Sequence, residues 1–376
     1  MRSRFSILVV VLALVASGCV LSRPTTEPVS GPLFEFPNYS ESGPFDVGVT
    51  TLQLGDREVE VWYPAGIGAT RHREPDAYFI RDFTSATVQS LLPPEVDPPF
   101  VTDAYRDVRA SRLHPFPVVL FSHGALSFRN QSTFLTTHLA SWGFVVASPD
   151  FLERGLQTFL GPQPAVPKTS LEVLDETVAV LTAENSRVGG PLKGRLDLDT
   201  ILPIGHSAGG GASSQFVVAN GAAAWSPMAA GASGPAGAGA SGLWMAGAND
   251  QIAQLAGVQA AFDAAPGPKR LVVIEGAGHN NAFSDICEIG ASGGGVIGLA
   301  REAGLPIPDS LARLGEDGCN EPNLPSPEVW PVVRHFVTAH LRFQAGVTTI
   351  PWGLDDDVVD RLDVPVTYTQ VGATAN

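Results

Sequence analysis

A serine in a glycine-flanked turn is the residue whose surroundings point most directly to chemistry. The turn Gly205-His206-Ser207-Ala208-Gly209 follows a short apolar segment, Thr200 to Ile204, and precedes a segment of helical character, Ala212 to Asn220. This order predicts a sharp strand-to-helix turn that exposes the hydroxyl of Ser207. Small residues flank it because the strand and helix backbones pass close to the turn. Ser207 is therefore predicted to be a nucleophile.

A serine nucleophile needs a base that accepts its proton and a carboxylate that orients the base. Two later apolar segments, Leu243 to Ala246 and Arg270 to Glu275, read as strands, and each is followed by a suitable residue. Asp250 follows the first and His279 follows the second. Both would lie just past the carboxyl ends of strands, where open α/β sheets place their sites. We expect His279 to be the base and Asp250 its partner.

Other downstream residues of the same types are placed less well. His335 and His340 fall within a final helix predicted from Ser326 to Phe343 and read as residues of its faces. Asp263 falls inside a predicted helix, and Asp285 comes after the histidine instead of before it.

Two backbone amides are expected to stabilise the oxyanion that forms when a serine attacks a carbonyl carbon. One should belong to Ala208, the residue after the nucleophile. The other should come from the loop after the apolar strand Pro117 to Phe121, where Ala125 is the first candidate and Gly124 the second. His206, next to the serine, is expected to lie near the substrate. This chemistry requires no metal and no cofactor.

The elements that must position these residues alternate along the chain. Apolar strands and helices follow one another from Pro117 to Phe343, and the strands are apolar throughout. This pattern is typical of a parallel sheet covered by helices on both faces. An antiparallel hairpin is predicted earlier, from Thr51 to Tyr63 around Gly55-Asp56. We expect a single α/β domain over residues 46–345.

Three segments are expected to add little to that sheet. Ala65 to Pro115 is rich in proline and is predicted to make a long excursion over one edge of the site. Met228 to Ser241 consists almost wholly of small residues and is predicted to be a flexible surface loop. Residues 346–376 are predicted to be a C-terminal surface extension, in which Asp355 to Asp357 read as solvated residues and not as a calcium site.

The N-terminus has the features of an export signal. Arg2 and Arg4 precede an apolar run, Ile7 to Val15, that is too short to remain as a membrane span. Ala16-Ser17-Gly18-Cys19 resembles the lipobox of bacterial lipoproteins, which implies a signal peptide over residues 1–18 and lipidation of Cys19. Cleavage without lipidation is the alternative. Residues 19–45 are rich in Pro, Ser, Thr and Gly, as in a tether.

Cysteine usage and net charge indicate a possible disulfide and the kinds of partner that are not expected. If Cys19 carries lipid, Cys287 and Cys319 remain as a pair, and disulfides persist in exported proteins. Two free thiols are the alternative. The formal net charge is −15 and no basic cluster lies outside the first residues, so nucleic-acid binding is not expected. Membrane contact is expected only through the N-terminal lipid.

Several segments carry a resemblance to a known superfamily. Together with Asp250 and His279, they resemble the α/β-hydrolase superfamily, and more closely its dienelactone-hydrolase-like branch. That branch includes cutinases and polyester hydrolases, bacterial relatives of platelet-activating-factor acetylhydrolase, and chlorophyllases. The resemblance covers about residues 47–343, and its specific segments are Val118 to Gly124, Leu139 to Ala147 and Gly205 to Gly210.

The resemblance implies an α/β-hydrolase fold and a serine esterase that works through an acyl-enzyme. Dienelactone hydrolase itself uses a cysteine, so Ser207 points to ordinary ester hydrolysis. Polyester hydrolases commonly carry an aromatic residue where this chain has Ala125. They also carry a tryptophan near the site, and Trp225 either matches it or is a residue of the core. The longer insertions at Ala65–Pro115 and Cys287–Cys319 favour the acetylhydrolase-like relatives and could cover the site.

We therefore expect an exported serine carboxylic-ester hydrolase, acting on a small-molecule, lipid or polymer ester. Two alternatives remain open on the sequence. The same three residues could transfer the acyl group to an alcohol, or the chain could be a catalytically silent, lipid-anchored binding protein.

Overall fold

The computed structural model describes residues 37–159, 161–235, 239–290 and 294–372. The predicted signal peptide, Cys19 and most of the predicted tether lie outside the described residues. The described part of the chain belongs to one compact unit. Within it, no helix has the length and apolar character needed to span a membrane.

A ten-stranded sheet forms the centre of the fold, in the order β12-β11-β10-β9-β8-β6-β7-β2-β1-β5. The six strands from β11 to β7 are mutually parallel, and β2 and β12 join this block antiparallel at its two sides. The strands are β1 (Val47–Leu54), β2 (Arg57–Pro64), β5 (Ala104–Arg106), β6 (Phe116–Ser122), β7 (Val145–Pro149), β8 (Leu196–His206), β9 (Ala224–Met228), β10 (Ser241–Gly247), β11 (Lys269–Ile274) and β12 (Val366–Val371).

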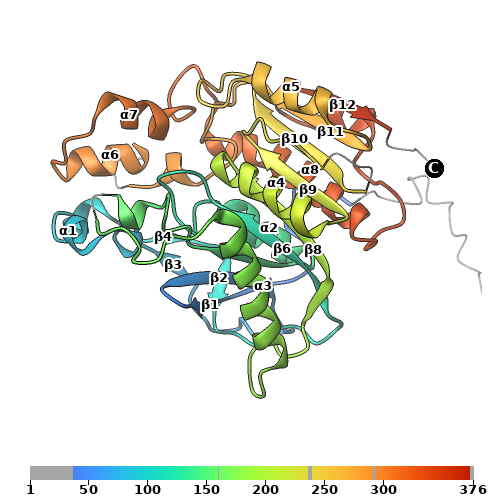
Figure 1. The fold of residues 1–376 in the computed structure, drawn as a ribbon, viewed down its shortest axis with the longest axis horizontal. Coiled ribbons are helices and arrows are strands. Elements are labelled where there is room, and N and C mark those ends of the chain that lie inside the picture. The colour runs from blue at the N-terminus through green and yellow to red at the C-terminus, as the bar shows by residue number, and fades with distance from the viewer. Residues whose placement is uncertain (1–36, 160, 236–238, 291–293, 373–376) are drawn as a thin grey trace, which may run out of the picture. The chain divides into compact units, whose positions relative to one another are not determined.

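Helices cover both faces of this sheet (Figure 1). One core contains apolar side chains of α2 (Thr133–Ser141) and α8 (Ser326–Gln344). Two further cores contain those of α3 (Ser170–Ser186), α4 (Ala208–Asn220) and α5 (Leu255–Ala264). The expected mostly parallel α/β sheet with helices on both faces is confirmed.

The two long insertions pack against each other beside the main sheet. The excursion 65–115 forms a small sheet of β3 (Ala77–Tyr78) and β4 (Phe100–Val101), and a short helix α1 (Ala86–Gln89). The insertion between the cysteines forms α6 (Gly295–Glu302) and α7 (Asp309–Glu316). A separate apolar cluster joins them and includes Val88 from the excursion and Leu299 from the insertion. Figure 1 shows α1, α6 and α7 together at one end of the molecule.

The C-terminal segment differs from the sequence prediction. The sequence predicts a surface extension over residues 346–376, but β12 pairs antiparallel with β11 along six residues and closes that side of the sheet. Leu354, Val358 and Val364 are buried in the main core. Most side chains of β12 are exposed, as in an edge strand. The sequence alone does not distinguish such a strand from an unpaired C-terminal segment, because its pairing partner β11 lies about 90 residues earlier in the chain.

Two smaller boundary predictions also change. Tyr39, in the predicted tether, is buried in the main core and its carbonyl accepts a hydrogen bond from His138. The domain therefore begins before residue 46. Ala229, Ala230 and Ala232 are buried, so the start of the small-residue segment after β9 is part of the structure and not a surface loop.

Candidate active site

The turn between β8 and α4 has the geometry that its glycines predict. Ser207 has φ 55° and ψ −121°, a backbone conformation that residues other than glycine rarely adopt and that costs about 1–3 kcal/mol. The backbones approach closely on both sides. A Cβ atom on Gly205 would lie 2.3 Å from the carbonyl oxygen of Gly209, and one on Gly209 would lie 1.9 Å from that of Ser122. The surrounding backbone therefore holds Ser207 in this conformation at the tip of the turn, where its side chain is half-buried and lines a pocket.

His279 and Asp250 meet at the carboxyl edge of the same sheet. The loop after β11 carries His279 and the loop after β10 carries Asp250, and the His279 Nδ1–H donates to Asp250 Oδ2 at 2.9 Å. The other carboxylate oxygen accepts the backbone amides of Ile252 and Ala253 at 2.8 and 2.7 Å. Both carboxylate oxygens are thus fixed. The imidazole is left with Nε2 free of the Asp250 contact, as a proton acceptor requires.

Ser207 and His279 line the same pocket, together with His206. Among the described residues, no hydrogen bond joins the Ser207 hydroxyl to the imidazole. Such contacts are often long in an unliganded enzyme and tighten when substrate binds.

The two candidate amides of the loop after β6 differ in their partners. The backbone N–H of Gly124 donates to the side-chain oxygen of Gln131 at 2.7 Å, so it already has an acceptor. Ala125, the next residue, is exposed and lines the pocket with Ser207. Ala208 is exposed at the first position of α4, where amides have no partner within the helix. Ala125 and Ala208 remain the candidate donors.

His206 connects three loops of the site. Its Nε2 lies 2.9 Å from the carbonyl oxygen of His279, which can only accept, so Nε2 carries the proton. Its Nδ1 then accepts from the side-chain amide of Gln131 at 2.6 Å. Burial holds the pKa of His206 well below its ordinary value, so the ring is neutral. A chain of hydrogen bonds runs from Gly124 through Gln131 and His206 to His279.

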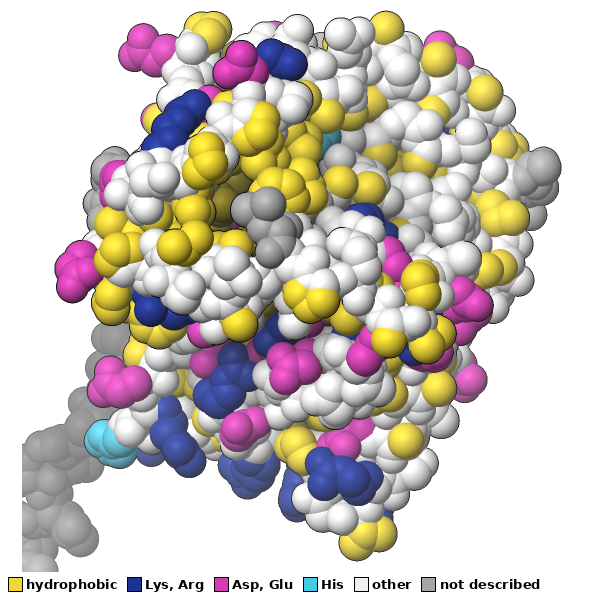
Figure 2. Space-filling model, turned by 60° about the vertical axis from the view of Figure 1, so that its left-hand side comes forward, with side chains coloured by type: hydrophobic (Ala, Val, Ile, Leu, Met, Phe, Trp, Pro, Cys, Tyr) yellow, Lys and Arg dark blue, Asp and Glu magenta, His cyan; other side chains and the backbone are white. Residues whose placement is uncertain are grey.

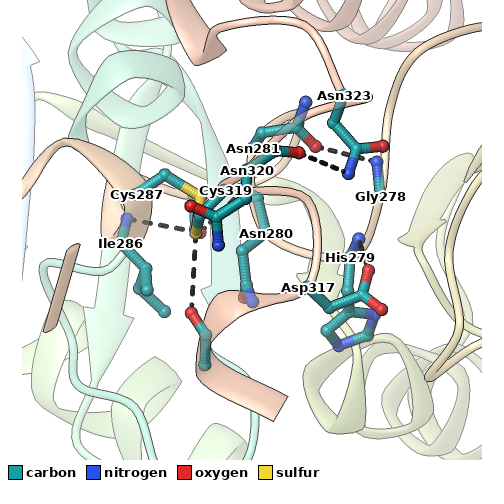
Figure 3. Close-up of a disulfide and its surroundings, with 12 residues drawn as sticks. Gly278, His279, Asn280, Asn281, Ile286, Cys287, Asp317, Cys319, Asn320 and Asn323 are labelled. Atoms are coloured by element: carbon teal, nitrogen blue, oxygen red, sulfur yellow. Dashed lines mark hydrogen bonds between the residues drawn. A yellow bond between two sulfur atoms is a disulfide. The ribbon is translucent and has the colours of Figure 1, made fainter. Parts of the chain in front are cut away.

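Asp317 lies beside His279 (Figure 3). Its Oδ1 accepts the backbone amide of His279 at 2.6 Å, and its Oδ2 accepts that of Gln251 at 3.1 Å. Asp317 lies two residues before Cys319, whose predicted disulfide with Cys287 is present in the structure. The insertion that carries α6 and α7 is thereby tied to the loops of His279 and Asp250.

The remaining candidates fall outside the reacting centre. Trp225 is buried against Trp244 in the core between the sheet and α5, and is not part of the pocket wall. Asp285 accepts the backbone amides of Thr133 and Phe134 and so stabilises the start of α2. His335 and His340 are buried in α8. No group of residues suited to hold a metal ion occurs within the described part of the chain.

Gln131 and Asp317 are the residues that the sequence did not reveal. Gln131 lies two residues before α2, and Asp317 lies in the insertion between the cysteines, next to Gly318. Neither has a motif around it. Only the hydrogen bonds across the fold, to residues 75 and 38 positions away, show what they contact.

The sheet has the α/β-hydrolase fold: its strands are mostly parallel, and the loops that carry Ser207, Asp250 and His279 follow the carboxyl ends of three of them. Residues 97–158 match the family model of platelet-activating factor acetylhydrolase, isoform II. The chain is similar to this family over that segment, which includes Gly124 and Ala125 but neither Ser207 nor His279. No curated protein matches the chain. The expected resemblance to the acetylhydrolase-like branch is confirmed, and it supports a hydrolase that acts on esters.

Proposed function

We propose that this protein is an exported serine carboxylic-ester hydrolase that uses Ser207, His279 and Asp250. One observation carries the proposal. Ser207 occupies a strained turn that lines the same pocket as His279, and the Nδ1 atom of His279 lies 2.9 Å from the carboxylate of Asp250. The similarity of residues 97–158 to an acetylhydrolase family supports an ester as the substrate.

In the proposed reaction, Nε2 of His279 takes the proton of Ser207 as Oγ attacks the ester carbonyl carbon. Asp250 keeps the proton of the imidazole on Nδ1 and stabilises the imidazolium that forms. The amides of Ala125 and Ala208 donate to the oxyanion, each typically worth about 3 kcal/mol of barrier. His279 then returns the proton to the departing alcohol. Water hydrolyses the acyl-enzyme by the same steps.

The test is hydrolysis of p-nitrophenyl acetate by the purified full-length protein in detergent. Ser207→Ala should lower kcat by about a thousandfold or more. Ser214→Ala is the matched control, because this serine lies in the same helix and its hydroxyl binds the carbonyl of Ser233. Equal rates for wild type and Ser207→Ala would refute the assignment. Product analysis with an added alcohol separates hydrolysis from acyl transfer, and a folded protein without turnover would favour a binding role.

Export and anchoring rest on the sequence alone. We propose that cleavage before Cys19 leaves this cysteine lipidated in the cell envelope, with the hydrolase on a tether. Mass spectrometry of the mature N-terminus is the test. A diacylglyceryl-modified Cys19 that Cys19→Ser abolishes is the expected result. An unmodified N-terminus near this position would mean a secreted protein.

A further inference from the structure

The pocket beside Ser207 changes character along its length. Polar groups gather at the catalytic end, where Gln131, His206, His279 and Asn280 line it. The other lining side chains are apolar except for Thr84 and Ser127. No Asp, Glu, Lys or Arg side chain occurs among its described lining residues. A substrate group that enters beyond the catalytic end would therefore meet no charged partner.

Most of the apolar lining residues come from the two insertions. Ile80, Val88 and Leu92 come from the excursion before β5, while Ile297, Leu311 and Leu314 come from α6 and α7. Figure 2, which turns this end of the molecule towards the viewer, shows hydrophobic side chains gathered around a hollow. Leu311 and Leu314 are only half-buried, although they face the pocket from one side of α7. Apolar surface left open beside a candidate active site is surface that a ligand can cover.

We propose that this pocket binds an uncharged aliphatic chain of the ester, longer than an acetyl group. The inference rests on the proposed function and adds the substrate class to it. A sugar or a charged headgroup in the same place would lose its hydration without finding hydrogen-bond partners. A methylene group in this place favours binding, because each one transferred from water strengthens binding about threefold to fourfold. The chain can belong to the acyl or to the alcohol part of the ester.

Chain length is tested first on the full-length protein, with p-nitrophenyl acetate against p-nitrophenyl octanoate and with ethyl acetate against octyl acetate. In one of these two pairs, we expect kcat/KM for the ester with the eight-carbon chain to exceed that for its short partner by about tenfold or more. Preference for p-nitrophenyl octanoate places the chain on the acyl side, and preference for octyl acetate over ethyl acetate places it on the alcohol side. An equal or higher kcat/KM for the short ester in both pairs would overturn the proposal.

Charge is tested with a substrate of the same length. The p-nitrophenyl monoester of suberic acid differs from the octanoate by a terminal carboxylate. Its kcat/KM should be lower by about tenfold or more, because the wall holds no cation that could pair with it. Where the chain-length test places the chain on the acyl side, equal kcat/KM for these two esters would contradict an uncharged pocket.

Substitutions then locate the chain. Leu311→Asp places a charge on the pocket wall, and Ser310→Asp places the same charge one residue earlier, where the side chain is exposed and outside the wall. Both lie in the first turn of α7, where an acidic residue favours the helix. Leu311→Asp should lower the ratio of long-chain to acetate kcat/KM by about tenfold, and Ser310→Asp should leave it unchanged.

A second variant guards against misfolding of the first. Ala300→Trp, in α6, should narrow the pocket and lower the same ratio. Acetate turnover that persists in wild type and disappears in Ser207→Ala establishes the esterase independently of chain length. If that turnover holds and both pocket variants keep the wild-type ratio, the chain pocket is refuted while the proposed function stands.

Discussion

Asp317 and His279 are joined by a hydrogen bond of 2.6 Å, from the backbone amide of His279 to the carboxylate of Asp317. The second oxygen of this carboxylate accepts the amide of Gln251, the residue after Asp250. Burial raises the pKa of Asp317 above its ordinary value. The half-buried carboxylate of Asp317 thus fixes two loops: the one that carries His279, the proposed base, and the one that carries Asp250, which orients this base. Because it touches their backbones and not the pocket, its expected role is positioning.

We predict that Asp317→Ala lowers kcat on p-nitrophenyl acetate by about tenfold to a hundredfold with little change in KM, because hydrogen bonds to a charged group contribute about 1.5–3 kcal/mol. Asp317→Asn keeps an oxygen acceptor and should recover part of the loss. Glu316→Ala is the control, since this neighbouring carboxylate pairs with Arg301 instead. Wild-type kcat in Asp317→Ala would show that the loops hold their geometry without this contact.

Gln131 provides a second prediction. Its side chain accepts the amide of Gly124 and donates to His206, so Gln131→Leu leaves two buried groups without partners. Each such group costs about 1–3 kcal/mol, and we expect the free energy of unfolding and kcat both to fall. Gln131→Glu restores only the acceptor for Gly124. Urea denaturation and ester hydrolysis of the two variants separate the effects. A stable, fully active Gln131→Leu would refute the role of this bridge.

The sequence predicted what local patterns determine. The serine turn was predictable because Gly205 and Gly209 lie only two residues from Ser207. The alternation of apolar strands and helices predicts the parallel sheet that the structure contains. The order of strands also placed Asp250 and His279 at one edge, because parallel strands end on the same side. These predictions needed only periodicity and spacing.

What the sequence could not predict depends on contacts between distant segments. The engaged amide of Gly124, the role of Asp317 and the pairing of β12 with β11 each join residues that no motif connects. The sequence does not decide whether Trp225 lies at the site or in the core, and its packing against Trp244 places it in the core.

The close approach at the serine turn gives a matched pair of glycine substitutions. Gly209→Ala places a Cβ 1.9 Å from the carbonyl oxygen of Ser122, so β6 or α4 must shift. We expect loss of activity and a free energy of unfolding lower by about 3 kcal/mol or more. Gly211→Ala lies in the same helix with nothing within 4 Å of the added Cβ. It should stabilise the protein by about 0.5–1 kcal/mol. Circular dichroism during urea denaturation measures both, and similar stability of the two variants would contradict the close approach.

Buried histidines make stability dependent on pH. Burial lowers the pKa of His138 to about 3, while an unfolded histidine titrates near 6.5. As pH falls below about 6.5, the unfolded chain takes up a proton that the folded chain refuses, so stability is lost down to about pH 3 and retained above that window. His138→Gln can still donate to the carbonyl of Tyr39 but does not titrate.

The variant should therefore lose less free energy of unfolding between pH 6 and pH 4 than wild type, by about 1.4 kcal/mol per pH unit. Urea denaturation at several pH values in this window measures the difference. Comparing the two slopes removes the contribution of all groups that the variants share. Identical slopes would mean that His138 is protonated in the folded state.

The disulfide should support both stability and activity, because it lies next to the contact that holds His279. Replacing both cysteines, Cys287→Ser with Cys319→Ser, removes a link across a sequence separation of 32 residues. In the chain-entropy model this lowers the free energy of unfolding by about 3–4 kcal/mol. Asp317 lies two residues before Cys319, so its hold on His279 should loosen and kcat should fall as in Asp317→Ala. Combining the double cysteine replacement with Asp317→Ala then separates the two effects. If the disulfide acts on catalysis through Asp317, the combined variant has the kcat of Asp317→Ala alone, whereas a further multiplicative loss would assign the disulfide an independent route to the site.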